Sequence, residues 1–511
     1  MPLATEERFC MKIEIKNLGP ISTFDFDLSK DFNIIFGQNN IGKSYAITAI
    51  YLILKNLTRL RSSPIELDYY YLRRRLHGFP VDQSTFLRGD RNLMAQIDSI
   101  QEKLIGKIKS SVQEEIDVTS EVERIFKTIL NQAIVQELEK SFKNSFSSIE
   151  NLSNKYSDEK FSIVLVFEDF SFSLTSKDNG LLIENLKVNI PVIVKKIHTN
   201  RRLNFAKERI TVYFNTKAKD DRSRDLSLLD ILFGKLYNGI RREITQVANQ
   251  IYFLPASRSG LYQALSTFSA VIAELSKSRS FLSTKIELPN ISEPVSDYFL
   301  YLANISNRKS KEFNEIIKEI EKEILKGEVL FNKDTKKIVF SPSDIKVELD
   351  LSFTSSMISE IAPIVAYLKY IISSEVDSPY IIQESRGKKP YNVLFIEEPE
   401  AHLHPAIQVK LTELFCKLIE SNVKIIITSH SNYMFNKLSN LILEGNVDHN
   451  NVGSYLMKMT ENGSIVDKLA MKPDRDGIED QNFADVAEQL YEERIRIYEK
   501  LNKDAASASS Q

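Results

Sequence analysis

Apolar and polar positions near the N-terminus predict three short strands followed by a helix. The strand runs are separated by Gly19-Pro20 and by a turn at Asp31, and they are KIEIKNL (12–18), ISTFDFDL (21–28) and FNIIF (32–36). The segment YAITAIYLILKNL (45–57) then places apolar residues at helical spacing. The sequence therefore predicts three N-terminal strands, a short loop and an apolar helix, in that order.

The rest of the chain changes pattern several times. Helical and charged sequence fills about 60–160, and because no clean heptad persists there, it predicts a helical hairpin or small bundle rather than a long coiled coil. Alternation returns over 161–197 and predicts antiparallel strands around the turn KDNG. A second helical region covers about 261–328, and strand patterns follow at KKIVF (336–340) and IKVELDLSF (345–353).

Composition narrows the class of protein. The 511 residues leave room for about three domains. Hydrophobic residues at 42% and charged residues at 27% are ordinary for a soluble globular chain. Cys10 and Cys416 are too few for a disulfide framework or a cysteine metal site, and no apolar run reaches the roughly 18 residues of a membrane helix. With no secretory pattern at the N-terminus, we expect a cytoplasmic protein without a membrane partner.

Charge leaves one question open. A net charge of -2 argues against a coat of nucleic acid, yet basic clusters occur at 59–63, 71–78, 201–209 and 241–242. These clusters fit either a solvated surface or part of a DNA or RNA track. DNA therefore stays a possible partner.

The loop between the third strand and the helix has the pattern of a phosphate-binding loop. GQNNIGKS fits G-x-x-x-x-G-K-[ST], with the residues Gly37, Gln38, Asn39, Asn40, Ile41, Gly42, Lys43 and Ser44. The glycines let backbone N–H groups turn toward phosphate oxygens. Lys43 would place a positive charge near the β and γ phosphates, and Ser44 would offer its hydroxyl to Mg²⁺. The alternative, a structural turn, lacks a reason for this spacing.

A second strand ends in acids. In NVLFIEEPEAHLHP (392–405) four apolar residues precede Glu397 and Glu398, and open α/β sheets bind ligands at this edge. Glu397 is expected to hold Mg²⁺, directly or through water, and Glu398 to polarise the attacking water. A surface acidic turn is the alternative.

Histidines follow these acids. KIIITSHS (424–431) is another apolar strand that ends near His430, which is expected to hydrogen-bond the γ-phosphate and sense its presence. His402 and His404 have an H-x-H spacing, but zinc usually needs three or four protein ligands and nothing nearby completes a site.

Together GQNNIGKS, LFIEEPEAHLHP and ITSHS resemble the ATP-binding head of ABC-type ATPases of the SMC and OLD-nuclease branch. The resemblance implies an α/β fold, a P-loop NTPase head with a mixed sheet flanked by helices and with helical and small β insertions. It also implies that FTSSMISEIAPIVAYLKYI (353–371) is the signature segment, whose Ser355 and Ser356 would reach the γ-phosphate on the opposite subunit. SSMISE stands where transporters have an LSGGQ-like run. IYFLPASRSGL (251–261) is also similar to this family, and Arg258 would pair with phosphate or the acidic loop, or form an ordinary salt bridge.

The predicted organisation is one head interrupted by insertions. The expected units are the first part of the head with the phosphate loop (1–60), a helical insertion (61–160), a β-rich and helical insertion (161–244), the second part of the head with its helical region (245–470), and a helical extension with a tail (471–511).

The resemblance implies an ATPase that uses Mg²⁺ and forms a homodimer or higher homo-oligomer around two ATP molecules. Similar heads in bacterial phage-defence systems, such as the Septu ATPase, work with a separate nuclease, so an effector protein is an expected partner.

Two other functions stay open. An OLD-type nuclease would need a further domain with metal-binding acids. Glu444, Asp474 and Asp476 resemble such acids, but the segment after His430 is too short for that domain. An SMC-like repair ATPase would need hundreds of heptad residues.

Overall fold

The structure is a computed structural model. It describes residues 11–59, 90–157, 159–177, 180–197, 205–206, 209–215, 242–265, 291–305, 310–372, 391–467, 470–480 and 484–508. The basic cluster at 71–78, and parts of the helical predictions over 60–160 and 261–328, lie outside these residues.

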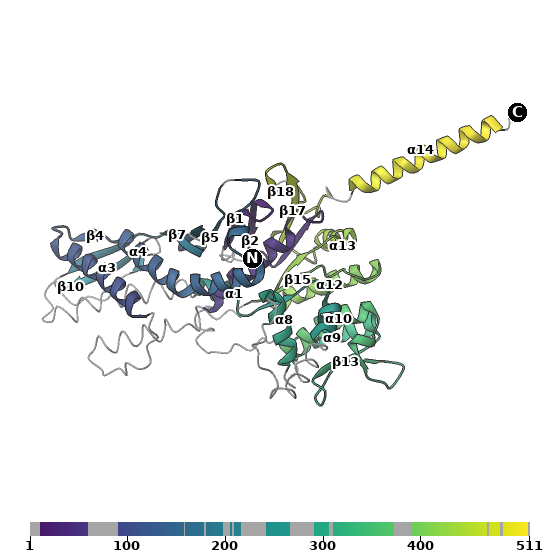
Figure 1. Cartoon of the computed structure of the whole chain (residues 1–511), viewed down its shortest axis with the longest axis horizontal. Coiled ribbons are helices and arrows are strands. Elements are labelled where there is room, and N and C mark those ends of the chain that lie inside the picture. The colour runs from purple at the N-terminus through teal and green to yellow at the C-terminus, as the bar shows by residue number, and fades with distance from the viewer. Residues whose placement is uncertain are drawn as a thin grey trace, which may run out of the picture.

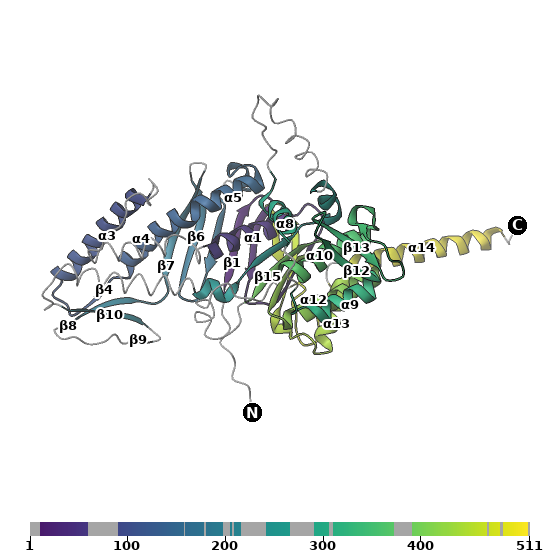
Figure 2. The ribbon, with the colours of Figure 1, turned by 90° about the horizontal axis from the view of Figure 1, so that it is seen from below.

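A mixed sheet of eleven strands runs through the molecule in the order β11-β15-β16-β3-β17-β18-β2-β1-β5-β6-β7 (Figures 1 and 2). Its strands are β1 (Lys12–Leu18), β2 (Ile21–Asp27), β3 (Phe32–Gly37), β5 (Ser162–Val166), β6 (Phe170–Lys177), β7 (Gly180–Val188), β11 (Ile251–Leu254), β15 (Asn392–Glu397), β16 (Val423–Thr428), β17 (Val452–Thr460) and β18 (Gly463–Asp467). The first five strands in this order pair in parallel. Beyond β17 the pairing is antiparallel except between β18 and β2.

The strands β3, β11, β15 and β16 are buried on both faces, which is why their sequences are mostly apolar. In β3, Phe32, Ile34 and Phe36 belong to one hydrophobic core, whereas Ile35 belongs to the other. β15 alternates in the same way, with Val393 facing the core that contains Ile35. The end of each strand is thereby fixed between two packed layers.

Helices cover the two faces. On one side lie α1 (Lys43–Arg59) and α5 (Gln136–Phe146), whereas α8 (Glu293–Ala303) packs against the edge strand β11 and buries Tyr298 and Leu302 in the core of the other side. On the other lie α9 (Asn314–Glu319), α10 (Ser356–Ala366), α12 (Pro405–Glu420) and α13 (Asn432–Leu443). A three-stranded sheet of β12 (Gly327–Asn332), β13 (Lys337–Pro342) and β14 (Leu349–Asp350) leads into α10.

The alternating segment 161–197 does form strands, but three of them belong to the main sheet. β5 pairs with β1, and β6 and β7 follow it outward, so these three strands extend the main sheet. The fourth strand, β8 (Val192–Ile197), joins β4 (Glu115–Asp117), β10 (Arg209–Asn215) and β9 (Phe205–Ala206) in another sheet, beside α3 (Asp90–Ser110) and α4 (Thr119–Leu130). Figure 2 shows this end of the molecule farthest from α12 and α13.

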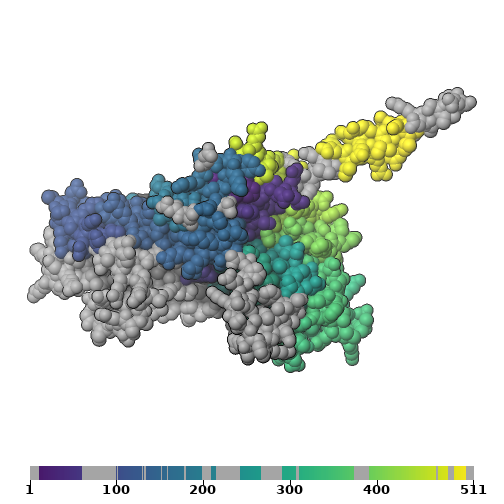
Figure 3. All heavy atoms as spheres, viewed as in Figure 1, coloured from purple at the N-terminus to yellow at the C-terminus, as the bar shows by residue number. Residues whose placement is uncertain are grey.

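The final helix, α14 (Ala484–Ala508), extends away from the body (Figures 1 and 3). Within the described ranges, no helix combines the length and apolar character that crossing a membrane requires.

Candidate nucleotide-binding site

The loop between β3 and α1 needs glycine at two positions. Gly37 has a φ of 139° and Gly42 a φ of 98°, both in the region that L side chains rarely adopt. A Cβ on Gly37 would lie 2.6 Å from the carbonyl oxygen of Met457, and one on Gly42 would lie 2.7 Å from Pro20. Between them Gln38, Asn39 and Asn40 are exposed, while Ile41 is buried and anchors the loop. The loop is a tight, surface-facing turn of backbone.

Lys43 is the first residue of α1 and is buried. Its ammonium group donates to the carbonyl oxygens of Gly37 at 2.9 Å and Gln38 at 2.6 Å, which holds the side chain over the loop. Burial lowers the pKa of Lys43 to about 8, and the negative charges of Glu398 and Glu400 oppose that shift. The loop therefore carries a cation whose charge changes near physiological pH.

Ser44 links the loop to the strand acids. Its hydroxyl donates a hydrogen bond to the carboxylate of Glu397, the last residue of β15, and the amide of Ala256 also donates to Glu397. Burial raises the pKa of Glu397, whereas these two hydrogen bonds oppose the rise. In the sheet, β16 lies between β15 and β3. Ser44 and Glu397 meet across the end of that intervening strand.

Glu398 follows in a left-handed conformation, with φ of 42°. Its amide donates to the carbonyl oxygen of Thr428 at 3.1 Å, so the chain turns over the end of β16. The carboxylate stays partly exposed and lies 3.8 Å from Nε2 of His430. A left-handed backbone conformation costs free energy in a residue other than glycine. At Glu398 it changes the direction of the chain directly after Glu397.

His430 is positioned by an acid that sequence reasoning missed. Glu400 accepts a hydrogen bond from the His430 amide at 2.5 Å and another from the Ser429 hydroxyl at 3.0 Å. Burial raises the pKa of Glu400. Burial and the charge of Lys43 lower the pKa of His430, and the charge of Glu398 opposes that shift. The one sequence feature that could have drawn attention to Glu400 is its position two residues after Glu398.

Arg258 does pair with the acidic loop, but through the backbone. It is fully buried and donates to the carbonyl oxygens of Glu397 at 2.8 Å and Glu398 at 3.3 Å. It also forms a buried ion pair of 3.1 Å with Glu360 of α10. Arg258 therefore both contacts the acidic loop and forms a salt bridge, the two alternatives that the sequence left open. Glu360 was not recognised from the sequence.

The segment 353–371, which the resemblance predicts to be the signature, begins at the end of the 3-10 turn Leu351–Phe353. Ser355 is the N-cap of α10, and its hydroxyl accepts from the Ile358 amide at 3.4 Å. Ser355 and Ser356 are both exposed. Among the described residues, neither serine forms a hydrogen bond with the loop 37–44 of its own chain. The first turn of α10 thus presents its free end to solvent.

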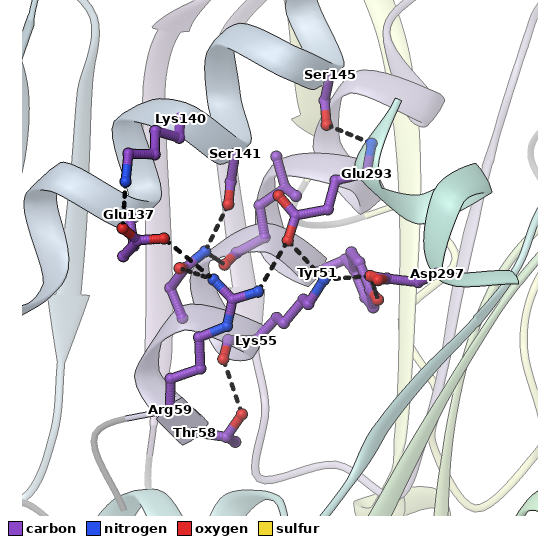
Figure 4. A network of polar contacts seen from close by, with 12 residues as sticks. Tyr51, Lys55, Thr58, Arg59, Glu137, Lys140, Ser141, Ser145, Glu293 and Asp297 are labelled. Atoms are coloured by element: carbon purple, nitrogen blue, oxygen red, sulfur yellow. Dashed lines mark hydrogen bonds and ion pairs between the residues drawn. The ribbon is translucent and has the colours of Figure 1, made fainter. Parts of the chain in front are cut away.

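The helix that begins at Lys43 is tied to the helices beside it (Figure 4). The Tyr51 hydroxyl donates to Asp297 at 2.5 Å, and Lys55 pairs with Asp297 and with Glu293. Asn56 donates to Ser141 of α5 at 3.1 Å. These contacts connect α1 to α8 and to the helical insertion.

Other candidate metal ligands take structural positions. His404 is the N-cap of α12, where its Nδ1 accepts from the Ala406 amide at 3.3 Å. The Asp474 carboxylate accepts from the Asp476 amide at 2.8 Å within a turn. Over the part of the chain that the structure describes, no three His, Cys, Asp or Glu side chains are grouped to hold a metal ion.

The residues present fit a magnesium nucleotide. Ser44 and Glu397 supply a hydroxyl and a carboxylate in contact, which are the hard oxygen ligands that Mg²⁺ takes in small number when phosphates complete its shell. The buried Lys43 ammonium and the glycine turn fit phosphate oxygens.

The sheet and its flanking helices confirm the predicted α/β fold class. The model of the AAA ATPase domain family matches residues 11–435. The chain belongs to this family, and the matched part contains the phosphate loop, the strand acids and His430.

Comparison with solved structures finds head domains of SMC proteins, with low sequence identity and low TM-scores. The SMC head domain from Thermotoga maritima is 11% identical with a TM-score of 0.34, over 89% of this chain and 97% of that chain. An Smc head domain with an extended coiled coil, bound to the C-terminal domain of ScpA derived from Pyrococcus furiosus, is 12% identical with a TM-score of 0.33, over 95% and 99%. No curated protein matches the chain in a sequence comparison.

Proposed function

We propose that this chain binds ATP with Mg²⁺ and hydrolyses it to ADP and phosphate at the carboxyl ends of β3, β15 and β16. The observation that carries the proposal is the convergence of separate segments. Ser44 hydrogen-bonds Glu397, and Glu398 lies 3.8 Å from His430, although these residues come from three distant parts of the sequence. Lys43 lies close enough to influence the pKa of His430.

Each residue has a role that follows from its surroundings. The backbone N–H groups of the loop and the Lys43 ammonium would bind the β and γ phosphates. Bound Mg²⁺, held by Ser44 and Glu397, would neutralise phosphate charge. Glu398 would orient and polarise the attacking water, and His430 would hydrogen-bond the γ-phosphate. Glu400 fixes His430 through its backbone and so acts as a positioning residue.

We infer that the complete site needs two chains. Charge that develops on the γ-phosphate requires further donors on the side away from the loop. Ser355 and Ser356 are exposed at the start of α10 and make no hydrogen bond to their own loop. In a dimer with two ATP molecules between the heads, each α10 would present its first turn to the nucleotide of the other chain.

An effector protein is the proposed target of this cycle, and the resemblance to phage-defence ATPases supports a separate nuclease in that role. The link from α1 to α5 and α8 would transmit movement of the loop to the insertion. Affinity purification of the chain, expressed with its neighbouring genes, tests the partner. A partner that co-purifies with the parent, and whose nuclease activity depends on ATP, is expected.

The ATPase proposal is tested by Lys43→Ala, which removes the cation from the loop. Filter binding and phosphate release should show at least a hundredfold loss of both binding and turnover, about the size expected when a charged contact to phosphate is lost. Lys458→Ala is the matched control, because Lys458 is an exposed lysine paired with Asp467 on β17 and β18. Full turnover in Lys43→Ala would refute the proposal.

A further inference from the structure

The C-terminal helix carries an apolar stripe that the molecule itself leaves exposed. Leu490, Ile497 and Leu501 are 61%, 52% and 57% exposed, and together with Arg494 they recur at spacings of four, three and four residues. Such spacing keeps the four side chains on one face of a helix. A helix of this kind gains most of its stability in water by burying that face against another element.

Two tyrosines and two opposite charges flank the stripe. Tyr491 and Tyr498 lie along one edge and are 65% and 55% exposed. Glu493 and Lys500 lie along the other edge, each one position before a stripe residue. Every side chain from Glu488 to Leu501 is exposed, and Figure 3 shows the helix standing clear of the body.

Charge is divided along this helix. The stretch 488–493 contains Glu488, Glu492 and Glu493 with no basic residue, whereas 494–501 contains Arg494, Arg496 and Lys500 with Glu499. Two copies that pair antiparallel bring the acidic half of each against the basic half of the other. Glu493 and Lys500 then face each other twice, which is the repeated contact that a two-fold interface produces.

Arg494 argues against the parallel arrangement. In a parallel pair, residues at equivalent stripe positions meet, so Arg494 would pack against the Arg494 of the other copy. In the antiparallel pair it meets Ile497 instead, Leu490 meets Leu501, and Tyr491 lies near Tyr498. Arg494 already stacks over Tyr498 of its own helix, at 5.8 Å from the ring centroid, so its charged end has a place beside the seam.

We propose that α14 is a self-association element, which pairs antiparallel with the α14 of a second copy of this chain and does so without nucleotide. We assign the partner of this face as a second copy of the chain, because the acidic half of one α14 complements the basic half of another. This contact is separate from the ATP-dependent contact proposed above. It places the two heads at opposite ends of the paired helices, so the two contacts need not join the same two chains.

Sedimentation velocity of the full chain, freed of nucleotide and measured over a dilution series, tests the proposal. The mass of the parent should approach twice the chain mass of 58.6 kDa. Leu490→Asp with Ile497→Asp should weaken association by at least about a hundredfold, because two apolar side chains leave the seam. Ile495→Asp is the matched control, since Ile495 is exposed on the same helix but lies off the stripe, and it should leave the dimer intact.

Charge reversal tests the orientation. Glu493→Lys alone and Lys500→Glu alone should each weaken the dimer, and the double exchange should restore it, because each pair is remade with reversed sign. Lys43→Ala should dimerise like the parent in these conditions, which separates this contact from the ATP-dependent one. A monomeric parent, association that survives the double aspartate variant, or a double exchange that fails to restore the dimer would each overturn the proposal.

Discussion

Arg258 and Glu360 form a buried ion pair that joins the acidic end of β15 to the first turns of α10. Both side chains are fully buried and lie 3.1 Å apart, and the same guanidinium donates to the backbone oxygens of Glu397 and Glu398. Glu360 also accepts from the amide and hydroxyl of Ser259. Movement of the acidic loop is therefore coupled to α10, whose first turn carries Ser355 and Ser356.

Removing one charge of this pair should weaken both the fold and the coupling. Glu360→Gln keeps the shape of the side chain but leaves Arg258 without its anion, at a cost of about 3 to 5 kcal/mol in the free energy of unfolding. Urea denaturation measures that cost. Lys458→Gln, which breaks an exposed pair with Asp467, should cost less than about 1 kcal/mol. Equal stability of the two variants would contradict the assigned role of the pair.

ATP binding should weaken as the pH rises through about 8. Lys43 has a lowered pKa of about 8 in the free site, and only its protonated form attracts phosphate. Above that pH the protonated fraction, and with it the affinity, should fall about tenfold per unit. The terminal phosphate, with a second pKa of about 6, is already ionised and adds no slope. Isothermal titration between pH 7 and 10 measures this dependence. His430→Asn should show the same slope, because the pKa of His430 is lowered further from this range.

Glu398→Gln should bind ATP but hydrolyse it at least about a hundredfold more slowly, since the water loses its base. In ATP and magnesium this variant should accumulate an assembly larger than its nucleotide-free form. Adding Ser356→Arg should prevent that assembly by placing bulk at the exposed start of α10, while filter binding of ATP persists. Mass photometry with and without ATP decides the outcome. Assembly and turnover unchanged by Ser356→Arg would show that α10 does not act on the other chain.

Lys55→Met should loosen α1 from α8. The side chains of Glu293 and Asp297 are only 13% exposed, and removal of Lys55 leaves Asp297 with the Tyr51 hydroxyl and Glu293 with Arg59 at 3.4 Å. We expect a loss of about 2 kcal/mol in the free energy of unfolding. Lys143→Met removes an exposed helical pair with Glu139 and should cost about 0.5 kcal/mol or less. Thermal unfolding of both variants gives the comparison, and a Lys55→Met protein as stable as the control would exclude a stabilising role for this network.

Local pattern was sufficient to predict the elements that hold the site. The strand β3 with the start of α1, the strand β15 with its two acids, and the strand β16 before His430 follow from apolar runs that end in polar residues. Pairing between distant strands has no such local signal. The insertion of β16 between β3 and β15, and the growth of the main sheet by β5 to β7, therefore emerged only in the structure.

The same limit explains the missed side chains. Glu400 acts by accepting from Ser429 and His430, about thirty residues away in sequence, and Glu360 acts through Arg258, about a hundred residues away. Neither contact produces a local pattern that can be recognised in the sequence. His404, conversely, has the spacing of a metal ligand but uses its ring nitrogen to cap α12.

The sheet order also sets when this protein can acquire its function during synthesis. β3, which leads into the loop 37–44, pairs on one side with β16 and on the other with β17, so its neighbours begin 391 (423 minus 32) and 420 (452 minus 32) residues later. Until β16 has left the ribosome, the strand has two unpaired edges and an apolar surface, and one edge stays unpaired until β17 follows. The nascent N-terminal segment therefore stays unpaired, exposed to chaperones and to aggregation, and the loop 37–44 is held between its two neighbouring strands only after residue 460 has been made.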